Sequence, residues 1–329
     1  MEHKSLGEPA SDNRPLVLLN RPPEFFFSFQ TWVQPRFRVL DPFEPSFPSP
    51  AVQALAQSAR IILCLGNPPL PAETLARYPL VECVVCSSAG VDYVDLAECR
   101  RRGIRVTNAG EAFSEDVADY AVGLLIDVLR RVSASDRYVR SRLWPVKGEY
   151  PLGCKLGGRR VGIVGLGSIG SKVATRLQAF GCRIAYNSRK KKPHVPFPYH
   201  ESVKDLATNS DNLIICCALT KETHHIINKE VMTALGKEGV IVNVGRGALI
   251  DEKELVQFLV EGELGGAGLD VYKDEPNVPR EMFELDNVVL SPHKAVLTPE
   301  SIVAVQELVI ANLEAFFANK PLPSEVKLE

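Results

Sequence analysis

The chain has 329 residues, a formal net charge of −2 and 45% hydrophobic residues, and this length favours two globular domains over one. Its 38 basic and 40 acidic residues nearly balance, which argues against a nucleic-acid partner. No apolar run approaches the ~18 residues that a membrane span requires. Residues 6–20 lack the apolar core of a signal peptide, and Glu2, Glu8 and Asp12 are atypical of a transit peptide. We therefore expect a soluble cytoplasmic protein with no membrane partner.

The N-terminal part of the chain alternates short apolar runs with helical patterns. Helices are predicted over 50–59, 71–77 and 94–102. The predicted strands are 16–19, 37–40, 61–65, 81–86 and 104–107. Because short connections link strands and helices in alternation, we expect a parallel sheet that is covered on both faces.

A long helix is predicted to follow Ser114, a residue type that favours the N-cap position, and its apolar spacing continues to Val132. A second alternating series begins after it. Its predicted strands are 161–164, 183–187, 213–218, 240–244, 266–270 and 287–290. Thr298 and Pro299 are typical of a helix start. We expect the apolar face of this last helix to pack back on the first domain.

The eight cysteines are too sparse for a disulfide scaffold in a chain of this length. The spacing Cys83-x-x-Cys86 raises the alternative of a redox or metal site. However, both cysteines lie in an apolar run typical of a buried strand, and no second Cys or His pair has zinc spacing. We therefore predict that the chain binds no metal.

Gly165, Gly167 and Gly170 form a Gly-x-Gly-x-x-Gly motif between an apolar strand and an amphipathic helix. In that context the first glycine allows a tight turn, the second lets the backbone approach a pyrophosphate, and the third lets the helix pack on the strand. The helix N-terminus also favours an anion. The motif predicts a dinucleotide site, for which a tight turn without a ligand is the alternative.

Cofactor specificity is expected at the end of the following strand, where an acidic residue would bind the ribose 2′-hydroxyl of NAD. No acid stands there, and Ser188, Arg189 and Lys190 occupy the place of a 2′-phosphate. Two charge-assisted hydrogen bonds of roughly 1.5–3 kcal/mol each would favour NADPH over NADH. The alternative is a solvated basic turn, which we accept for Lys191 and Lys192.

Polar residues follow several predicted strands at the edge where ligands bind in doubly wound sheets. Among them, Arg246 has the planar guanidinium that would bind a carboxylate and polarise a carbonyl. His293 is suited to donate a proton near neutral pH. Glu275 would orient the imidazole and stabilise its charged form. This set predicts hydride chemistry on a 2-oxo acid, although each residue alone is more typical of a surface or structural role.

These residues lie in blocks that resemble the D-isomer-specific 2-hydroxyacid dehydrogenase family. The blocks are 88–92, 165–170, 243–247, 268–271 with 274–276, and 291–293. The stretch Tyr186-Asn-Ser-Arg-Lys190 is similar to that of the plant glyoxylate/hydroxypyruvate and hydroxyphenylpyruvate reductases. The resemblance implies an α/β fold of two Rossmann/flavodoxin-like doubly wound parallel sheets. It places the substrate domain at 1–114 and 298–329, with the NADP(H)-binding domain, 115–297, inserted into it.

The resemblance also implies residue roles. Arg246 binds the substrate carboxylate, His293 donates the proton and Glu275 is its partner. The backbone N–H groups of Ala89 and Gly90 bind the same carboxylate. The implied cofactor residues are the glycine turn and its neighbours, the loop after the second strand, and the nicotinamide pocket, namely Gly165, Leu166, Gly167, Ser168, Ile169, Ser188, Arg189, Lys190, Val244, Gly245 and Asp270.

The family forms dimers through its cofactor domains, so a homodimer is expected. Trp144 lies where related reductases insert a tryptophan into the neighbouring subunit's active site, and a dimer contact or core aromatic is the alternative. Lys294 departs from the small residues that many relatives have after the histidine. His224 and His225 match no catalytic position and are interpreted as surface or helix-start residues.

The sequence therefore predicts an NADPH-dependent reductase that converts glyoxylate and hydroxypyruvate to glycolate and D-glycerate. Reduction of an aryl 2-oxo acid such as 4-hydroxyphenylpyruvate is one alternative, because the sequence does not define the pocket. A non-enzymatic NADP(H) sensor or corepressor on the same fold is another. The complete set of Arg246, Glu275 and His293 argues against the sensor.

Overall fold

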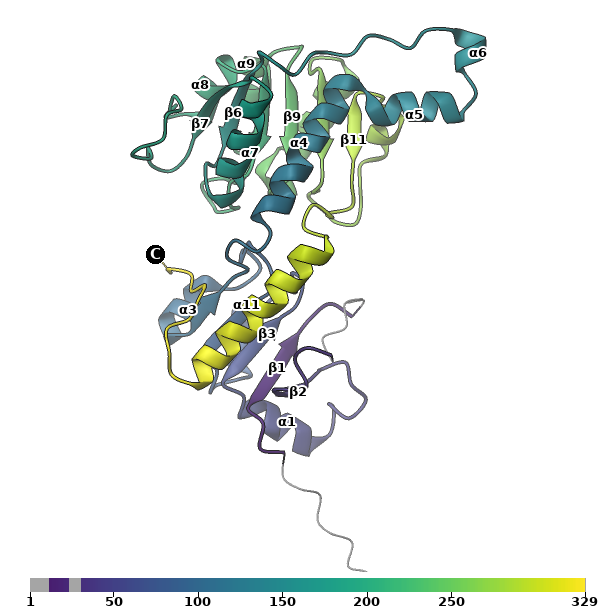
Figure 1. The fold of residues 1–329 in the computed structure, drawn as a ribbon. Helices are drawn as coiled ribbons and strands as arrows, with labels where there is room; N and C mark the ends of the chain where they lie inside the picture. Colours follow the sequence, from purple (N-terminus) through teal and green to yellow (C-terminus); the bar gives the residue numbers. More distant parts are fainter. Residues whose placement is uncertain (1–11, 24–30, 329) are drawn as a thin grey trace, which may run out of the picture. The chain divides into compact units, whose positions relative to one another are not determined.

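The computed structural model describes residues 12–23 and 31–328. They divide into two compact units (Figure 1), one up to Ala112 together with Ile302 onward, and the other Phe113–Ser301. Glu2 and Glu8, on which the targeting expectation rests, lie outside the described residues. Within the described ranges, no helix is long and apolar enough to cross a membrane.

Unit 1 contains a five-stranded parallel sheet in the order β2-β1-β3-β4-β5. Its strands are β1 (Leu16–Asn20), β2 (Arg38–Leu40), β3 (Ile61–Cys64), β4 (Cys83–Cys86) and β5 (Arg105–Thr107). Its helices are α1 (Pro50–Gln57), α2 (Ala72–Ala76), α3 (Leu96–Arg102) and nearly all of α11 (Pro299–Phe317). Every residue of β3 and β4 is buried, as expected for strands covered on both faces.

Unit 2 contains a six-stranded parallel sheet in the order β11-β10-β9-β8-β6-β7. Its strands are β6 (Arg160–Val164), β7 (Arg183–Asn187), β8 (Asn212–Ile215), β9 (Val240–Asn243), β10 (Gly266–Leu269) and β11 (Val288–Leu290). The strand order reverses between β6 and β8, the point where doubly wound sheets bind ligands. A bridge between Tyr186 and Tyr199 extends the sheet beyond β7.

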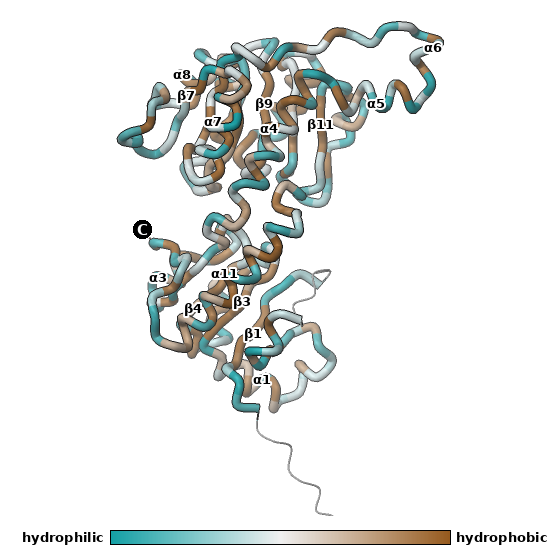
Figure 2. The backbone as a smooth tube through the Cα atoms, in the orientation of Figure 1, coloured by the Kyte–Doolittle hydropathy of each residue, from teal (hydrophilic) through white to brown (hydrophobic). Residues whose placement is uncertain are grey.

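The helices of unit 2 fall into two contacting groups. One contains α4 (Ser114–Arg130) and α7 (Ser168–Ala179), and α4 also contacts β9 and β10. The other contains α8 (Val203–Thr208), α9 (Lys229–Leu235) and α10 (Glu252–Val260). There are also two short 3-10 helices, η1 (Gly247–Leu249) before α10 and η2 (Arg280–Glu284) before β11. The strands between these groups are strongly hydrophobic (Figure 2), as expected when both faces of a parallel sheet are covered.

The start of α4 differs from the prediction. Phe113, not Ser114, is the N-cap residue, and no side chain caps the helix. Ser114 is the first helical residue and is only 2% exposed, so it lies against the core. Glu115 and Asp116 occupy the first turn, where acidic side chains interact favourably with the helix dipole.

The end of α4 also differs. The predicted apolar face ran on to Val132, but Arg131 adopts a left-handed conformation with φ +54° and ends the helix. Val132 begins the next helix, α5 (Val132–Arg140), and is 51% exposed. The start of α11 agrees with the prediction, because the Thr298 hydroxyl accepts a hydrogen bond from the Ser301 N–H and Pro299 is the first helical residue.

Candidate active site

The glycine turn joins β6 to α7 at the reversal point of the sheet. Gly165 has φ +96°, and a Cβ there would lie 2.5 Å from the backbone nitrogen of Cys217. A Cβ at Gly170 would lie 2.2 Å from the carbonyl oxygen of Gly165. Both positions therefore require glycine.

Gly167 faces open space, since a Cβ there would meet nothing within 4 Å. It is the N-cap residue of α7, and no side chain caps that helix. A helix N-terminus left uncapped beside open space fits a bound pyrophosphate. On this observation the residues present fit a dinucleotide.

The predicted cofactor residues all lie at one edge of the unit 2 sheet, because they follow parallel strands at their carboxyl ends. Leu166 is buried, whereas Ser168 is exposed and Ile169 is half-buried in the first turn of α7. Val244 and Gly245 follow β9 and are buried and half-buried respectively. This is the edge of a doubly wound sheet at which ligands bind, as the sequence predicted.

The loop after β7 is fixed by local hydrogen bonds. Asn187, which stands where an acidic residue would select NAD, instead donates its side-chain N–H groups to the carbonyls of His200 and Glu201 at 2.9 and 3.1 Å. The Ser188 hydroxyl donates to the Lys190 carbonyl at 2.8 Å. Arg189 and Lys190 are exposed on this loop.

The loop after β8 lies beside the loop after β7. The pKa of Glu222 is lowered, first by a hydrogen bond from the Thr220 side chain and then by the backbone N–H of Glu222 itself. The positive charges of Lys221 and Arg189 lower it further. The Arg189 guanidinium is thus close enough to influence a carboxylate on the neighbouring loop. Its positive charge stands at the edge where a 2′-phosphate is predicted.

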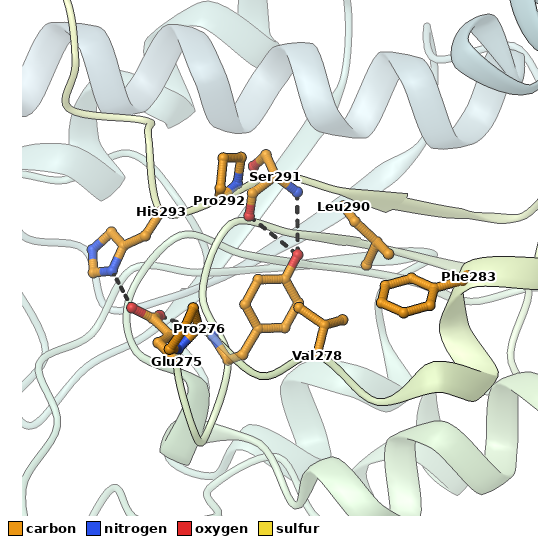
Figure 3. A pocket seen from close by; sticks show the side chains of 9 residues that line it. Glu275, Pro276, Val278, Phe283, Leu290, Ser291, Pro292 and His293 are labelled. Atoms are coloured by element: carbon orange, nitrogen blue, oxygen red, sulfur yellow. Dashed lines mark hydrogen bonds and ion pairs between the residues drawn. The ribbon is translucent and has the colours of Figure 1, made fainter.

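His293 and Glu275 form a hydrogen-bonded pair (Figure 3), with 2.7 Å between His293 Nδ1 and Glu275 Oε2. The other carboxylate oxygen, Oε1, accepts the backbone N–H of Tyr272 at 3.0 Å. Burial opposes ionisation of Glu275, but His293, the Tyr272 N–H and the charge of Arg246 outweigh it and lower the pKa of Glu275. The pairing leaves Nε2 of His293 as the nitrogen for proton transfer.

Arg246 follows β9 in a loop that Asn243 holds. The Asn243 side chain donates to the Arg246 carbonyl at 2.9 Å and accepts the Gly245 N–H at 3.0 Å. The Arg246 guanidinium donates to the Gly245 carbonyl at 2.9 Å, and its charge influences Glu275. A guanidinium, a carboxylate and an imidazole that are far apart in the sequence are thus gathered within unit 2.

Asp270 holds the loop that carries His293. Its carboxylate is buried, 1% exposed, and accepts the Ser291 hydroxyl at 2.6 Å and the N–H groups of Lys294 and Ala295 at 2.9 and 3.0 Å. His293 itself has φ +49° and donates its N–H to the Asp270 carbonyl at 2.8 Å. A contact of Asp270 with the nicotinamide carboxamide stays a prediction.

Three residues that organise the site were not predicted from the sequence: Asn243, Tyr272 and Ser291. Asn243 is fully buried at the end of an otherwise apolar strand. A polar residue in a buried run is a signal that could have identified it, as is its place in the block 243–247. Ser291 begins the block 291–293 but was assigned no role in it, and Tyr272 lies beside predicted site residues without a comparable signal.

Ala89 and Gly90 follow β4 in unit 1. Asn108 donates to the Ala89 carbonyl at 2.9 Å, and the Ser88 hydroxyl donates to the Gly90 carbonyl at 2.8 Å while it pairs with the Tyr93 hydroxyl at 2.7 Å. The two carbonyls are therefore held in place. The role of the Ala89 and Gly90 N–H groups in binding a carboxylate stays a prediction.

Trp144 begins the short helix α6 (Trp144–Lys147) and is 58% exposed. Within unit 2, α5 and α6 extend away from the sheet (Figure 1). Trp144 is not among the residues that line the pocket in Figure 3, and it is not among the groups hydrogen-bonded around His293. Its predicted role in a neighbouring subunit stays a prediction.

Cys83 and Cys86 are buried in β4 with reduced thiols. Over residues 12–23 and 31–328, no group of three or more His, Cys, Asp and Glu side chains is placed to hold a metal ion. His224 and His225 stack with ring centroids 3.9 Å apart in a turn, not at a helix start, and His225 Nδ1 lies 3.7 Å from Asp251.

Comparison with protein families identifies residues 122–295 as a D-isomer specific 2-hydroxyacid dehydrogenase NAD binding domain. The chain is 55% identical to a glyoxylate/hydroxypyruvate reductase of Arabidopsis thaliana, over 97% of this chain and 99% of that protein. It is 46% identical to a hydroxyphenylpyruvate reductase of Plectranthus scutellarioides, over 92% of each chain.

A solved structure shows the same architecture. It is the NADPH-dependent glyoxylate/hydroxypyruvate reductase of Sinorhizobium meliloti in complex with NADP and malonate, which matches with a TM-score of 0.87 at 34% identity and covers 96% of this chain and 97% of that one. The match confirms the predicted two-domain α/β fold of parallel sheets. With the motif blocks, the glycine turn and these similarities in agreement, the chain belongs to the D-isomer specific 2-hydroxyacid dehydrogenase family.

Proposed function

We propose that this chain is an NADPH-dependent reductase of small 2-oxo acids, converting glyoxylate to glycolate and hydroxypyruvate to D-glycerate. The observation that carries the proposal is the His293–Glu275 pair beside Arg246, at the same sheet edge as the glycine turn. The similarity to glyoxylate/hydroxypyruvate reductases over nearly the whole chain supports this substrate class.

The proposed cofactor site uses groups from four strand ends. The glycine turn (Gly165–Ile169) would hold the pyrophosphate, and Ser188, Arg189 and Lys190 would bind the 2′-phosphate. Val244, Gly245 and Asp270 would line the nicotinamide side. When bound, NADPH supplies the hydride that reduces C2 of the 2-oxo acid.

The chain's own residues then bind the acid and move one proton. Arg246 pairs with the substrate carboxylate and polarises the carbonyl, and the N–H groups of Ala89 and Gly90 bind the same carboxylate. His293 gives the proton on Nε2 to the oxygen as negative charge develops there. Glu275 keeps the imidazole oriented and compensates its positive charge before transfer.

We also propose that the protein is a homodimer assembled through its cofactor units, with Trp144 reaching the partner's active site. The supporting observation is the set of large apolar side chains exposed on and around α5 and α6. They are Val132, Val139, Trp144, Val146 and Leu152. Exposed apolar side chains gathered on one extension are typical of a surface that is covered in an assembly.

Reduction of aryl 2-oxo acids is the second candidate. It is favoured by the 46% identity to a hydroxyphenylpyruvate reductase. The test is to measure kcat/KM for glyoxylate, hydroxypyruvate, pyruvate and 4-hydroxyphenylpyruvate from the decrease in NADPH absorbance. The acid with the highest kcat/KM decides between the small-acid and aryl-acid candidates. NADPH binding without oxidation by any of these acids would instead support a sensor.

Changing Arg189 to aspartate is expected to reverse the cofactor preference. The substitution replaces a cation at the predicted 2′-phosphate position with an anion, and should lower the NADPH/NADH ratio of kcat/KM by about a hundredfold or more. Steady-state rates with each cofactor measure the ratio. Lys191→Asp, two residues away on the part of the loop interpreted as solvated, is the control, and an unchanged ratio for R189D would refute the assignment.

Replacing Glu275 with glutamine is expected to make the enzyme lose activity at a lower pH on the alkaline side of its pH profile. The lowered pKa of Glu275 means that the wild-type carboxylate stays charged as pH falls through its ordinary value of about 4.3, and it loses its contribution only below that. A neutral amide offers no negative charge to the imidazolium, so the basic limb of the kcat profile should move to lower pH.

The measurement for Glu275→Gln is kcat against pH at saturating NADPH and substrate. Glu281→Gln, on the exposed surface of η2, is the matched control and should keep the wild-type profile. A basic limb at the same pH in E275Q and wild type would show that Glu275 does not act through the charge of His293.

A further inference from the structure

Tyr272 lies three residues after β10 and is buried, although the mechanism assigns it no role. Its ring lines a pocket of about 270 Å³ together with Val278, Phe283 and Leu290. Its backbone N–H is hydrogen-bonded to Glu275, and its hydroxyl is hydrogen-bonded to Ser291. Tyr272 thus contacts both the segment that carries Glu275 and the segment that carries His293, the two residues of the proton-donor pair.

The backbone of Tyr272 holds Glu275. Its N–H donates to Oε1 at 3.0 Å, while Oε2 is bonded to His293 at 2.7 Å. With one oxygen held by the backbone and the other by the imidazole, the carboxylate has a defined orientation. A shift of residue 272 would therefore move the group that orients the proton donor.

The hydroxyl of Tyr272 holds the other segment. It accepts the Ser291 N–H at 3.2 Å and lies 3.1 Å from the carbonyl oxygens of both Leu269 and Ser291. It thereby links the end of β10 to the residue two positions before His293. Burial raises the pKa of Tyr272 to about 12, so this hydroxyl keeps its proton throughout the neutral range.

The Arg246 segment also lies against Tyr272. A Cβ at Gly247, the residue after Arg246, would lie 1.9 Å from the carbonyl carbon of Tyr272 and 2.1 Å from its oxygen. The two backbones are in direct contact, which only glycine permits. Tyr272 is thus the residue at which the segments of Arg246, Glu275 and His293 meet.

We propose that Tyr272 is a positioning residue that fixes the Glu275–His293 pair against the Arg246 segment, an inference that rests on the proposed reductase function. It touches neither substrate nor cofactor in this role. The titratable groups that act on the Tyr272 hydroxyl are Asp270, Glu275 and, from α4, Tyr120. Of these three, Glu275 is the one hydrogen-bonded to Tyr272, through the Tyr272 backbone N–H.

The test is Tyr272→Phe, which keeps the ring and the backbone N–H but removes the bond to Ser291. We expect kcat to fall about tenfold, as for one lost buried hydrogen bond. The basic limb of the kcat profile should move to lower pH, because a displaced His293 pairs less well with Glu275. The KM for hydroxypyruvate and the Kd for NADPH should stay within about twofold. Tyr78→Phe, which removes a tyrosine hydroxyl from unit 1, is the control.

A lower melting temperature with an unchanged pH profile would reduce Tyr272 to a purely structural residue and overturn the proposal. If Y272F does not fold, a fluorinated tyrosine at position 272 keeps the shape and the hydroxyl but makes the hydroxyl more acidic. A new loss of kcat at alkaline pH would then support the proposal, and an unchanged profile would overturn it. Wild-type protein that reduces none of the four acids would refute the proposed function instead.

Discussion

Replacing His293 with asparagine is expected to lower kcat by about 10²–10⁴-fold, the usual loss when a general acid is removed. The Kd for NADPH should change little, because His293 serves proton transfer and not cofactor binding. Asparagine is the better substitution than alanine, since His293 has φ +49° and asparagine tolerates the left-handed region. The loop should therefore keep its conformation while the proton donor is lost.

His194 offers a matched control, because it is an exposed histidine with φ +64°. His194→Asn should keep wild-type kcat with hydroxypyruvate and NADPH. Single-turnover rates at saturating cofactor separate the chemical step from product release. Wild-type turnover by H293N would require another proton donor, and the nearest alternative groups on these segments would have to be tested in turn.

The second large effect is expected at Arg246. Removing a charged partner of a carboxylate typically costs about 2–5 kcal/mol, so Arg246→Ala should lower kcat/KM by about thirty- to four-thousandfold. Both parameters should change: KM rises because the carboxylate loses its anchor, and kcat falls because the carbonyl is no longer polarised. Arg246→Lys keeps the charge without the planar fork, and we expect it to recover only part of the loss.

The measurement is steady-state kinetics with hydroxypyruvate for R246A, R246K and wild type. Arg100→Ala, at an exposed position on α3 in unit 1, controls for a general effect of removing an arginine. A rise in KM alone would limit Arg246 to binding. Wild-type kinetics in R246A would remove it from the site.

The strands could be predicted from the sequence because each is a short apolar run between turn residues. The predicted runs 183–187 and 266–270 correspond to β7 and β10 almost residue for residue. Helix ends were less predictable. Ser114 has the side chain of an N-cap, but tertiary packing buries it within the first turn of α4, and no local pattern contains that information.

The candidate site was predictable only in part. Arg246, Asp270 and His293 follow apolar strands, so topology alone indicated the shared edge. Tyr272 has no such signal, because its contribution comes from a backbone N–H and a hydroxyl whose partners are set by the folded loops. Asp270 was expected beside the nicotinamide. Its buried carboxylate also supports the histidine loop, a role that depends on residues more than twenty positions away.

Asp270 holds the His293 loop in a way that allows different residues at position 294. Lys294 contributes only its main-chain N–H to that carboxylate, and its side chain is exposed. Any amino acid except proline provides the same donor. The residue adjoining the proton donor can therefore vary in size or in charge while Asp270 continues to hold the loop.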